Sequence, residues 1–217
     1  FPMQQTKASQ ARLARMLFHR GVRGLLFGPS DEAWNFSGWP WEEFAPVSLG
    51  ALSHQPRMHK VAIDYFHSAF TACEILWQKG CRRIGFAIDP ALDARTEYRW
   101  LGGYLALLAA KAAPPLCYGG NTYKPSAFKS WVRRHKIDGL LTIHARLAGE
   151  IPGPTSVFLN DIEAPPDVHC FQLPPASIGA AGVRLLHHLL LRREFGLPLQ
   201  PKMSALQGLW REPSTLP

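Results

Sequence analysis

The sequence lacks the features that mark membrane-spanning and disulfide-stabilised proteins. None of its 217 residues falls in a run approaching the roughly 18 to 20 consecutive apolar residues that a membrane helix needs, and its start does not resemble a signal peptide. Only four cysteines occur, at no spacing typical of zinc or redox sites. We therefore expect a cytoplasmic protein with reduced thiols, mostly in its core. The cysteines are Cys73, Cys81, Cys117 and Cys170.

Motifs that organise catalysis are also missing. The sequence contains no Gly-x-Ser-x-Gly elbow, no phosphate-binding glycine loop and no His-Glu-x-x-His pair. Its nine histidines are scattered, and the adjacent His187 and His188 cannot share one face of a helix as metal ligands would. We therefore predict that the protein is not an enzyme, and the sequence indicates neither a metal site nor a cofactor.

Acidic residues are scarce beside basic ones. The 16 Asp and Glu residues face 24 Lys and Arg residues, which gives a formal net charge of +8. Most basic residues fall at the C-termini of predicted helices, where a cation interacts favourably with exposed carbonyls by about 0.3 to 1 kcal/mol. The alternative is a basic face that assists DNA binding. A concentrated basic block is absent, which favours the structural role.

What the sequence does contain is a repeated helix-to-strand design. The segments HRGVRGLLFG, QKGCRRIGFAI and RHKIDGLLTI each end a helix with basic residues, turn, and enter a short apolar strand. Such repetition indicates a parallel sheet with helices on both faces. With 47% hydrophobic residues, the chain is long enough for one large α/β domain or two smaller lobes. In these sheets, ligands bind beyond the carboxyl ends of the strands.

The stretch 61–108 has the most informative order of elements. A short strand over 61–63 ends in Asp64, and an amphipathic helix follows over 66–79. Gly80 ends this helix after a basic residue, and a buried strand follows over 84–88. An Arg-containing loop then precedes Gly-Tyr in a second helix. This pattern predicts a parallel crossover unit.

This order resembles the effector-binding core of the LacI/GalR transcription regulators. Further similar segments follow in the family's order along nearly the whole chain. They are HRGVRGLLFGP at 19–29, APVSLG at 45–50, IDGLLTIHA at 137–145, TSVFLND at 155–161 and FQLPPASIGAAGVRLLHHLL at 171–190.

The resemblance implies an α/β fold of two doubly wound parallel-sheet lobes joined by three crossovers, like the type I periplasmic binding proteins. We expect the crossings near Gly80, Phe171 and Leu197. The first lobe would then span 1–80 and 172–197, and the second lobe would span 81–171 and 198–217.

The family's first strand and first helix are missing, since the predicted helix over 6–19 corresponds to the second helix of the lobe. The first strand would lie between the second and third, so its loss predicts two unpaired strand edges inside the lobe. We infer that upstream residues include this strand and, before it, a helix-turn-helix module with a hinge helix.

The implied function is that of a regulator core which binds a small sugar-like metabolite in the cleft between the lobes. Ligand binding would shift the populations of lobe arrangements and change how a homodimer presents two upstream DNA-binding modules. No membrane is involved in this reading. Two alternatives are a solute-binding protein for transport and a degenerate regulator without a functional pocket.

The resemblance also implies ligand-binding residues just after the strands. Asp64 and Tyr65 would face the cleft from the first lobe. Carboxylates and guanidinium groups recognise hydroxyls through charge-assisted hydrogen bonds, and an aromatic face covers a sugar ring. The second lobe would supply Arg95, Arg99, Trp100, His144, Asn160 and Asp161.

Several of these residues have a structural alternative. Asp64 could cap the following helix, Arg99 could pair with an acidic neighbour, and His144 could be structural. In the LacI/GalR regulators an Arg lies three residues before the Gly of Gly-Tyr. Counted from Gly103, that position is Trp100 in this chain, and counted from Gly102 it is Arg99, so the register stays open.

Two segments depart from ordinary patterns. Only eleven residues separate Ile143 from Thr155, so the family's full helix must shrink there to a turn or two over 145–150, and one pocket wall is altered. The segment WNFSGWPWEEF at 34–44 is rich in tryptophan and predicts a loop that either lines the cleft or packs against the lobe.

Overall fold

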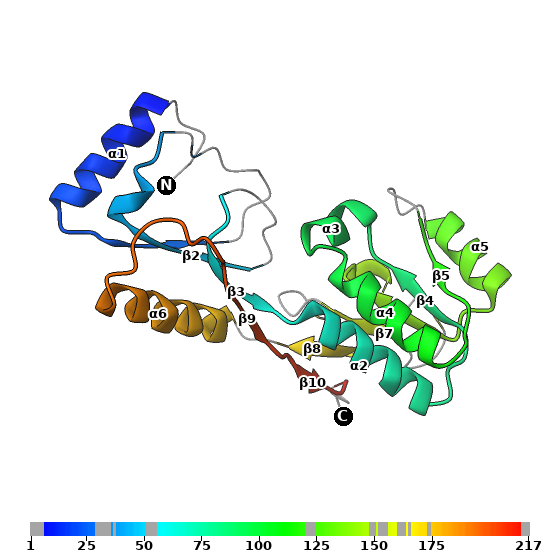
Figure 1. Ribbon diagram of the computed structural model, residues 1–217. Coiled ribbons are helices and arrows are strands. Elements are labelled where there is room, and N and C mark those ends of the chain that lie inside the picture. The colour runs from blue at the N-terminus through cyan, green and yellow to red at the C-terminus, as the bar shows by residue number, and fades with distance from the viewer. Residues whose placement is uncertain are drawn as a thin grey trace. The chain divides into compact units, whose positions relative to one another are not determined.

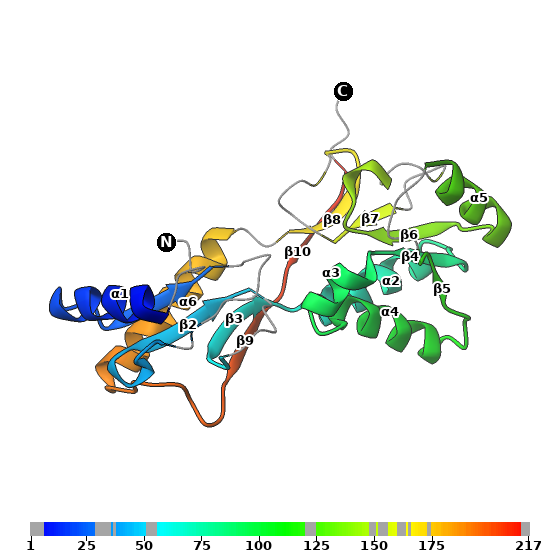
Figure 2. The same ribbon diagram turned by 90° about the horizontal axis from the view of Figure 1, so that it is seen from above.

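The computed structural model describes residues 7–28, 36, 38–50, 56–119, 125–147, 151, 156–159, 164, 166–172 and 175–213. The chain forms two compact units, each with its own sheet and helices (Figures 1 and 2). Unit 1 comprises Phe1–Ile63 and Pro175–Leu206, and unit 2 comprises Asp64–Pro174 and Gln207–Pro217. The chain therefore crosses between the units three times, which confirms the predicted α/β architecture of two lobes.

Unit 1 contains a four-stranded parallel sheet in the order β1-β2-β3-β9. Helix α1 packs on one face through Ala14, whose cluster includes Leu25 and Phe27 of β1. Helix α6 packs on the other face, where Leu189 meets Ala45 and Val47. The bounds are α1 Lys7–His19, β1 Gly24–Phe27, η1 Trp41–Glu43, β2 Ala45–Leu49, β3 His59–Ile63, α6 Pro175–Leu191 and β9 Met203–Leu206.

The prediction of two unpaired edges inside the first lobe is wrong. Strand β1 pairs directly with β2, in a parallel register that runs from Gly24 opposite Ala45 to Phe27 opposite Ser48. Helix α6 spans both strands: a Cβ on Gly24 would lie 2.9 Å from Leu186, and Gly182 leaves room for a side chain of β2. Because one helix packs closely on both strands, the strands are held side by side.

The tryptophan-rich segment packs into the core of unit 1. The ring centroids of Phe36 and Trp41 lie 5.0 Å apart, and those of Trp39 and Phe44 lie 5.6 Å apart. Trp39 and Phe44 are buried in the same cluster as Ala14 of α1. The described aromatic residues of this segment therefore pack within the lobe, which is one of the two alternatives that the sequence left open. Trp34 lies outside the described residues.

Unit 2 contains a six-stranded sheet in the order β10-β8-β7-β6-β4-β5. All neighbouring strands are parallel except β10, which runs antiparallel to β8. The bounds are α2 Tyr65–Gln78, β4 Ile84–Ala87, α3 Pro90–Arg95, α4 Arg99–Ala110, β5 Leu116–Cys117, α5 Pro125–His135, β6 Gly139–Thr142, η2 Ala145–Leu147, β7 Ser156–Phe158, β8 His169–Gln172 and β10 Leu209–Arg211.

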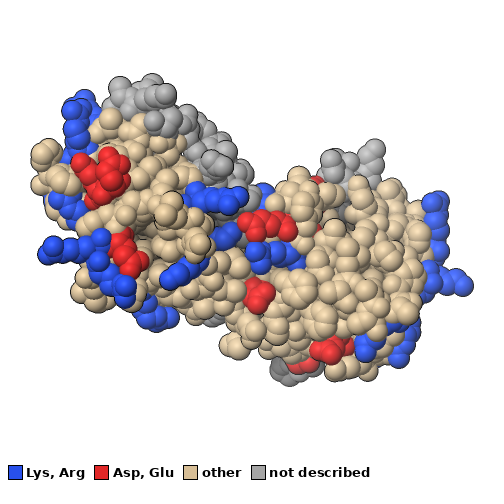
Figure 3. Space-filling view, in the orientation of Figure 1, with Lys and Arg blue, Asp and Glu red and all other residues tan. Residues whose placement is uncertain are grey.

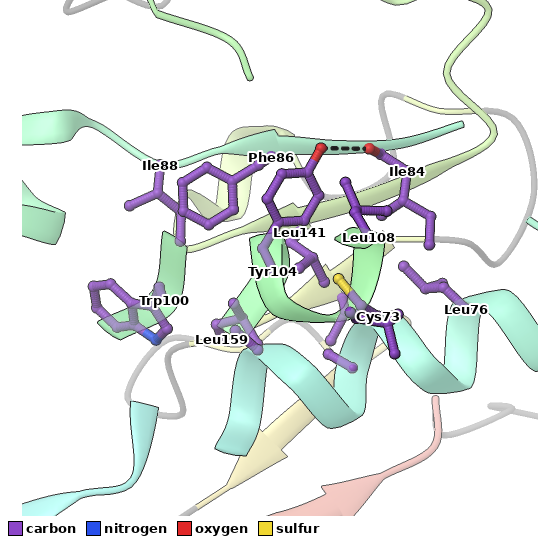
Figure 4. Packing of buried hydrophobic residues seen from close by; sticks show 14 of the residues in the cluster. Cys73, Leu76, Ile84, Phe86, Ile88, Trp100, Tyr104, Leu108, Leu141 and Leu159 are labelled. Atoms are coloured by element: carbon purple, nitrogen blue, oxygen red, sulfur yellow. Dashed lines mark hydrogen bonds between the residues drawn. The ribbon is translucent and has the colours of Figure 1, made fainter. Parts of the chain in front are cut away.

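The main core of unit 2 lies between the sheet and the helices α2 and α4 (Figure 4). The helices approach closely because Gly103 of α4 has no side chain: a Cβ there would collide with the carbonyl oxygen of Phe66 and lie 2.9 Å from the amide nitrogen of Phe70. The next residue ties α4 to the sheet. The hydroxyl of buried Tyr104 donates to the carbonyl of Ile84 at 2.9 Å and accepts from the amide of Leu116 at 2.7 Å.

The first crossing lies earlier in the chain than expected. Instead of near Gly80, the chain leaves unit 1 between Ile63 and Asp64, so α2 belongs to unit 2. The physical reason is that the buried face of α2, which includes Cys73 and Leu76, packs in the same core as β4 and α4. The other crossings fall at 174–175 and 206–207, against expectations near residues 171 and 197.

Strand β10 is held by a polar cluster at the edge of the unit 2 sheet. Buried His169 places its Nδ1 2.7 Å from Oε2 of Glu212, and its ring stacks on Trp210 with centroids 5.1 Å apart. The ammonium of Lys79, at the end of α2, lies 3.4 Å from the same carboxylate oxygen. These contacts bring the C-terminal segment of unit 2 against the strand and helix that precede it by many residues.

Two arginines of unit 2 donate hydrogen bonds to carbonyls at helix ends. Arg82 donates from Nη1 to the carbonyl of Trp77 at 2.8 Å, in the last turn of α2, and lies over the ring of the same residue. Arg83 donates from Nε to the carbonyl of His135 at the end of α5. On the face drawn in Figure 3, Asp and Glu side chains lie among the spread Lys and Arg side chains. For these two arginines the structure supports the helix-end role.

The thiols behave as expected for three of the four cysteines. Cys73, Cys81 and Cys170 are buried, whereas Cys117 is exposed, and all four are free thiols. Burial raises the pKa of the Cys73 thiol far above its usual range. Over the described ranges, none of the helices is long and apolar enough to cross a membrane.

The contact between α2 and α4 generates the first prediction. Gly103→Ala should lower the free energy of unfolding by roughly 1 to 3 kcal/mol, because the added methyl group must displace the backbone of α2. Gly102→Ala is the matched control, since its Cβ would meet only the Phe66 ring at 3.6 Å. That variant should be neutral or more stable by up to about 1 kcal/mol through helix propensity. Urea unfolding followed by circular dichroism measures both, and equal effects would contradict the account.

Candidate functional site

The candidate site lies at the carboxyl edge of the unit 2 sheet. Ile88 and Asp89 follow the end of β4 there, and Ile143 and His144 follow the end of β6. Because a helix that leads into or out of a parallel strand runs opposite to it, α2 and α4 both begin at this edge. Ligands of open α/β sheets bind at such edges.

All the predicted site residues that the structure describes belong to unit 2. The expectation that Asp64 and Tyr65 face the others from the first lobe is wrong, because α2 is part of unit 2. Asn160 and Asp161 lie outside the described residues. The remaining candidates follow β4 and β6 or begin α4; they are Arg95, Arg99, Trp100 and His144.

Asp64 is the N-cap of α2. Its Oδ1 accepts a hydrogen bond from the amide of His67 at 3.0 Å, and its carbonyl accepts from the amide and the hydroxyl of Ser68 at 3.0 and 2.9 Å. This confirms the capping role that the sequence left open. The carboxylate therefore satisfies one amide of the first turn of α2 and offsets part of the partial positive charge at this helix end.

Tyr65 and Trp100 form an aromatic pair where α2 and α4 begin. Their ring centroids lie 4.6 Å apart with an interplanar angle of 63°. Trp100 is only 7% exposed and belongs to the same buried cluster as Ile88 and Leu159. Figure 4 labels all three side chains. The Trp100 indole Nε1 is buried and has no hydrogen-bond partner in the described part of the chain.

One of the two arginines expected to touch the ligand forms an ion pair with an acidic neighbour. Arg99 pairs with Glu97 at 2.9 Å, and both side chains are substantially exposed. Sterically, Gly103 is the glycine that the neighbouring helix requires, whereas Gly102 has only ordinary contacts. Counting three residues back from Gly103 gives Trp100, whereas counting three back from Gly102 gives Arg99.

A buried carboxylate fixes the start of α4. Asp93 is 1% exposed, and its carboxylate accepts from the Thr96 hydroxyl at 3.0 Å and from the Leu101 amide at 3.2 Å. It holds a turn in which Glu97 and Tyr98 both adopt positive φ, at 60° and 56°. Burial, the dominant cause, raises the pKa of Asp93 above its ordinary value. Sequence reasoning missed this residue, because a charged side chain in a polar loop reads as exposed.

His144 is held by its backbone at the end of β6. Its amide donates to the Thr142 hydroxyl at 3.0 Å, and that hydroxyl donates to the Ala87 carbonyl at 3.0 Å. Burial lowers the pKa of His144, and the nearby Arg146 lowers it further. The imidazole is therefore neutral at neutral pH and can act as a hydrogen-bond donor or acceptor.

The structure describes residues 145–147 and Ile151 of the connection after His144, while the rest of the predicted short helix over 145–150 lies outside the described residues. The connection begins with the single 3₁₀ turn Ala145–Leu147, whose Leu147 amide donates to the His144 carbonyl at 2.9 Å. Leu147 and Ile151 pack into the second core cluster, with Phe128 and Val132 of α5. Leu147 and Ile151 therefore fix the described part of this connection to the core of unit 2.

The chemistry of this edge suits recognition more than reaction. It offers an aromatic pair, a neutral imidazole and helix N-termini that are already capped. Among the residues that can be placed, no three His, Cys, Asp or Glu side chains gather closely enough to hold a metal ion. Arg95 lies in the last turn of α3 and is half-buried.

Comparisons with known proteins bear on the fold. No protein-family model matches the sequence, and no curated protein matches it. A LacI-family transcriptional regulator from Rhizobium etli has a TM-score of 0.73 at 15% identity, over 97% of this chain and 84% of that one. A LacI-family regulator from Enterococcus faecium with bound ribose has a TM-score of 0.65 at 14% identity, over 94% and 82%.

A third structure is the periplasmic binding protein/LacI transcriptional regulator from Alkaliphilus metalliredigens, complexed with D-xylulofuranose. It has a TM-score of 0.63 at 13% identity, over 97% of this chain and 84% of that one. These likenesses confirm the predicted fold, that of the type I periplasmic binding proteins and the LacI-type regulator cores.

The buried carboxylate at the edge predicts a pH effect. Because its pKa is raised by folding, the folded chain keeps a proton that the unfolded chain releases above the usual Asp pKa of about 3.9. The free energy of unfolding should therefore fall as pH rises from about 4 through the raised pKa. Asp93→Asn lacks this titration, so the stability difference, variant minus native, should rise across that window and then level off.

Urea unfolding of both proteins at a series of pH values measures this difference, and the titrations of all other groups cancel in it. Stability curves that run parallel across the acidic range would contradict the burial of an ionisable Asp93.

Proposed function

We propose that this chain is the effector-binding and dimerisation core of a DNA-binding transcription regulator of the LacI/GalR kind. In this proposal it binds a small sugar-like metabolite at the carboxyl edge of the unit 2 sheet. The observation that carries the proposal is the match of fold over 94% of this chain or more to regulators of this kind, two of which were solved with ribose or D-xylulofuranose. The residues at the edge support it, because they offer an aromatic face beside neutral polar groups.

The mechanism we propose is a shift in populations. A ligand that contacts Tyr65 touches the second residue after the crossing from β3, so its binding energy acts directly on the chain segment that joins the units. Conformations that fit the ligand gain population in proportion to their differential affinity. A homodimer would then present upstream DNA-binding modules differently in the liganded and unliganded states.

The proposal predicts saturable stabilisation by a sugar. The chain would be titrated with D-ribose, D-xylulose and other neutral pentoses and hexoses while its melting temperature is followed. A ligand at 100 times its Kd should stabilise the folded state by about 2.7 kcal/mol, with a dependence on ligand concentration that saturates.

The control must separate binding from solvent effects, since sugars at high concentration stabilise proteins by exclusion from the surface. Each L-enantiomer at equal concentration provides that control, because exclusion does not distinguish enantiomers. Stabilisation that is linear in concentration and equal for both enantiomers across the whole panel would refute a sugar-sensing role.

A further inference from the structure

The buried indole of Trp100 leaves a donor unused at the candidate site. Trp100 is only 7% exposed, and its Nε1 hydrogen has no acceptor among the residues that the structure places. Buried donors are nearly always satisfied in proteins, because leaving one unpaired is unfavourable. An unpaired donor at a ligand edge therefore points to an acceptor that a ligand brings.

The surroundings of this donor are apolar. The ring of Trp100 meets Tyr65 at 4.6 Å between centroids and packs in one cluster with Ile88 and Leu159. Tyr65 is half-buried and is the first residue of α2. A ligand that reaches the indole must therefore present an apolar face and displace the Tyr65 ring by rotation of its side chain.

The starts of α2 and α4 are poor sites for an anionic ligand. Helix N-termini attract anions through their free amides. Here the chain's own carboxylates occupy them: Asp64 accepts from the first turn of α2, and Asp93 accepts from the Leu101 amide in the first turn of α4. Arg99, the cation nearest in sequence to Trp100, is paired with Glu97.

We propose that Trp100 and Tyr65 form a subsite for a neutral sugar, one with an apolar ring face and an oxygen that accepts the Trp100 Nε1 hydrogen. This inference rests on the proposed function and sharpens it, because it selects neutral sugars over sugar acids and makes Trp100 a specificity-determining residue. Arg99 takes no part in binding.

The test compares affinities by calorimetric titration for neutral sugars and for the corresponding uronic and aldonic acids. The native chain should bind a neutral sugar and should not bind the acids measurably. Trp100→Phe keeps an aromatic ring but removes the donor, so it should weaken neutral-sugar binding roughly tenfold. Arg99→Gln, the control on the neighbouring residue, should leave binding unchanged.

A spectroscopic readout covers the case in which Trp100→Phe does not fold. The ¹H–¹⁵N spectrum of the native chain contains the indole signals of its seven tryptophans. Assignment of the Trp100 signal and titration with the neutral sugar should move it downfield as the new hydrogen bond forms. A sugar that binds while this signal stays fixed would overturn the inference.

The outcomes separate the two proposals. If no sugar of either kind binds, the proposed function fails. If sugar acids bind more tightly than neutral sugars, and Arg95→Gln or Arg99→Gln abolishes that binding, the sugar-sensing function stands and the Trp100 subsite is wrong.

Discussion

The close approach of α2 and α4 at Gly103 is the constraint on which the candidate site depends. A Cβ at this position would collide with the backbone of α2, so the two helices can approach this closely only because residue 103 is glycine. Tyr104 then fixes α4 to the sheet through two hydrogen bonds. Because both helices begin at the carboxyl edge, this contact also brings Tyr65 against Trp100, and it makes α2 part of unit 2.

Internal carboxylates give this edge its chemical character. Asp64 and Asp93 hold the first turns of α2 and α4, and Asp89 caps α3 by accepting from the Ala91 amide at 2.8 Å. A helix N-terminus that accepts a carboxylate of its own chain offers fewer free amides, and less partial positive charge, to an anion. The edge therefore has aromatic surface and neutral polar groups to offer a ligand, which agrees with a neutral sugar as the effector.

Much of the fold could be predicted from the sequence, because alternating buried strands and basic helix ends leave few arrangements besides a parallel sheet. The cap at Asp64 could also be predicted from residue type and position. The partner of α2 was not, since an apolar stripe says that a helix is buried without saying against which sheet. Spacing alone could not tell which of Gly102 and Gly103 the contact with α2 requires, because that depends on where the backbone of Phe66 lies. Asp93 escaped notice because its burial depends on tertiary packing.

Hydrogen–deuterium exchange with and without a stabilising neutral D-sugar tests the central claim most directly. If the ligand binds at the carboxyl edge of unit 2, peptides covering 64–70 and 93–104 should gain protection, and the L-enantiomer should leave them unchanged. Protection confined to the strands β1 and β2 of unit 1, with no change where α2 and α4 begin, would contradict the site described here.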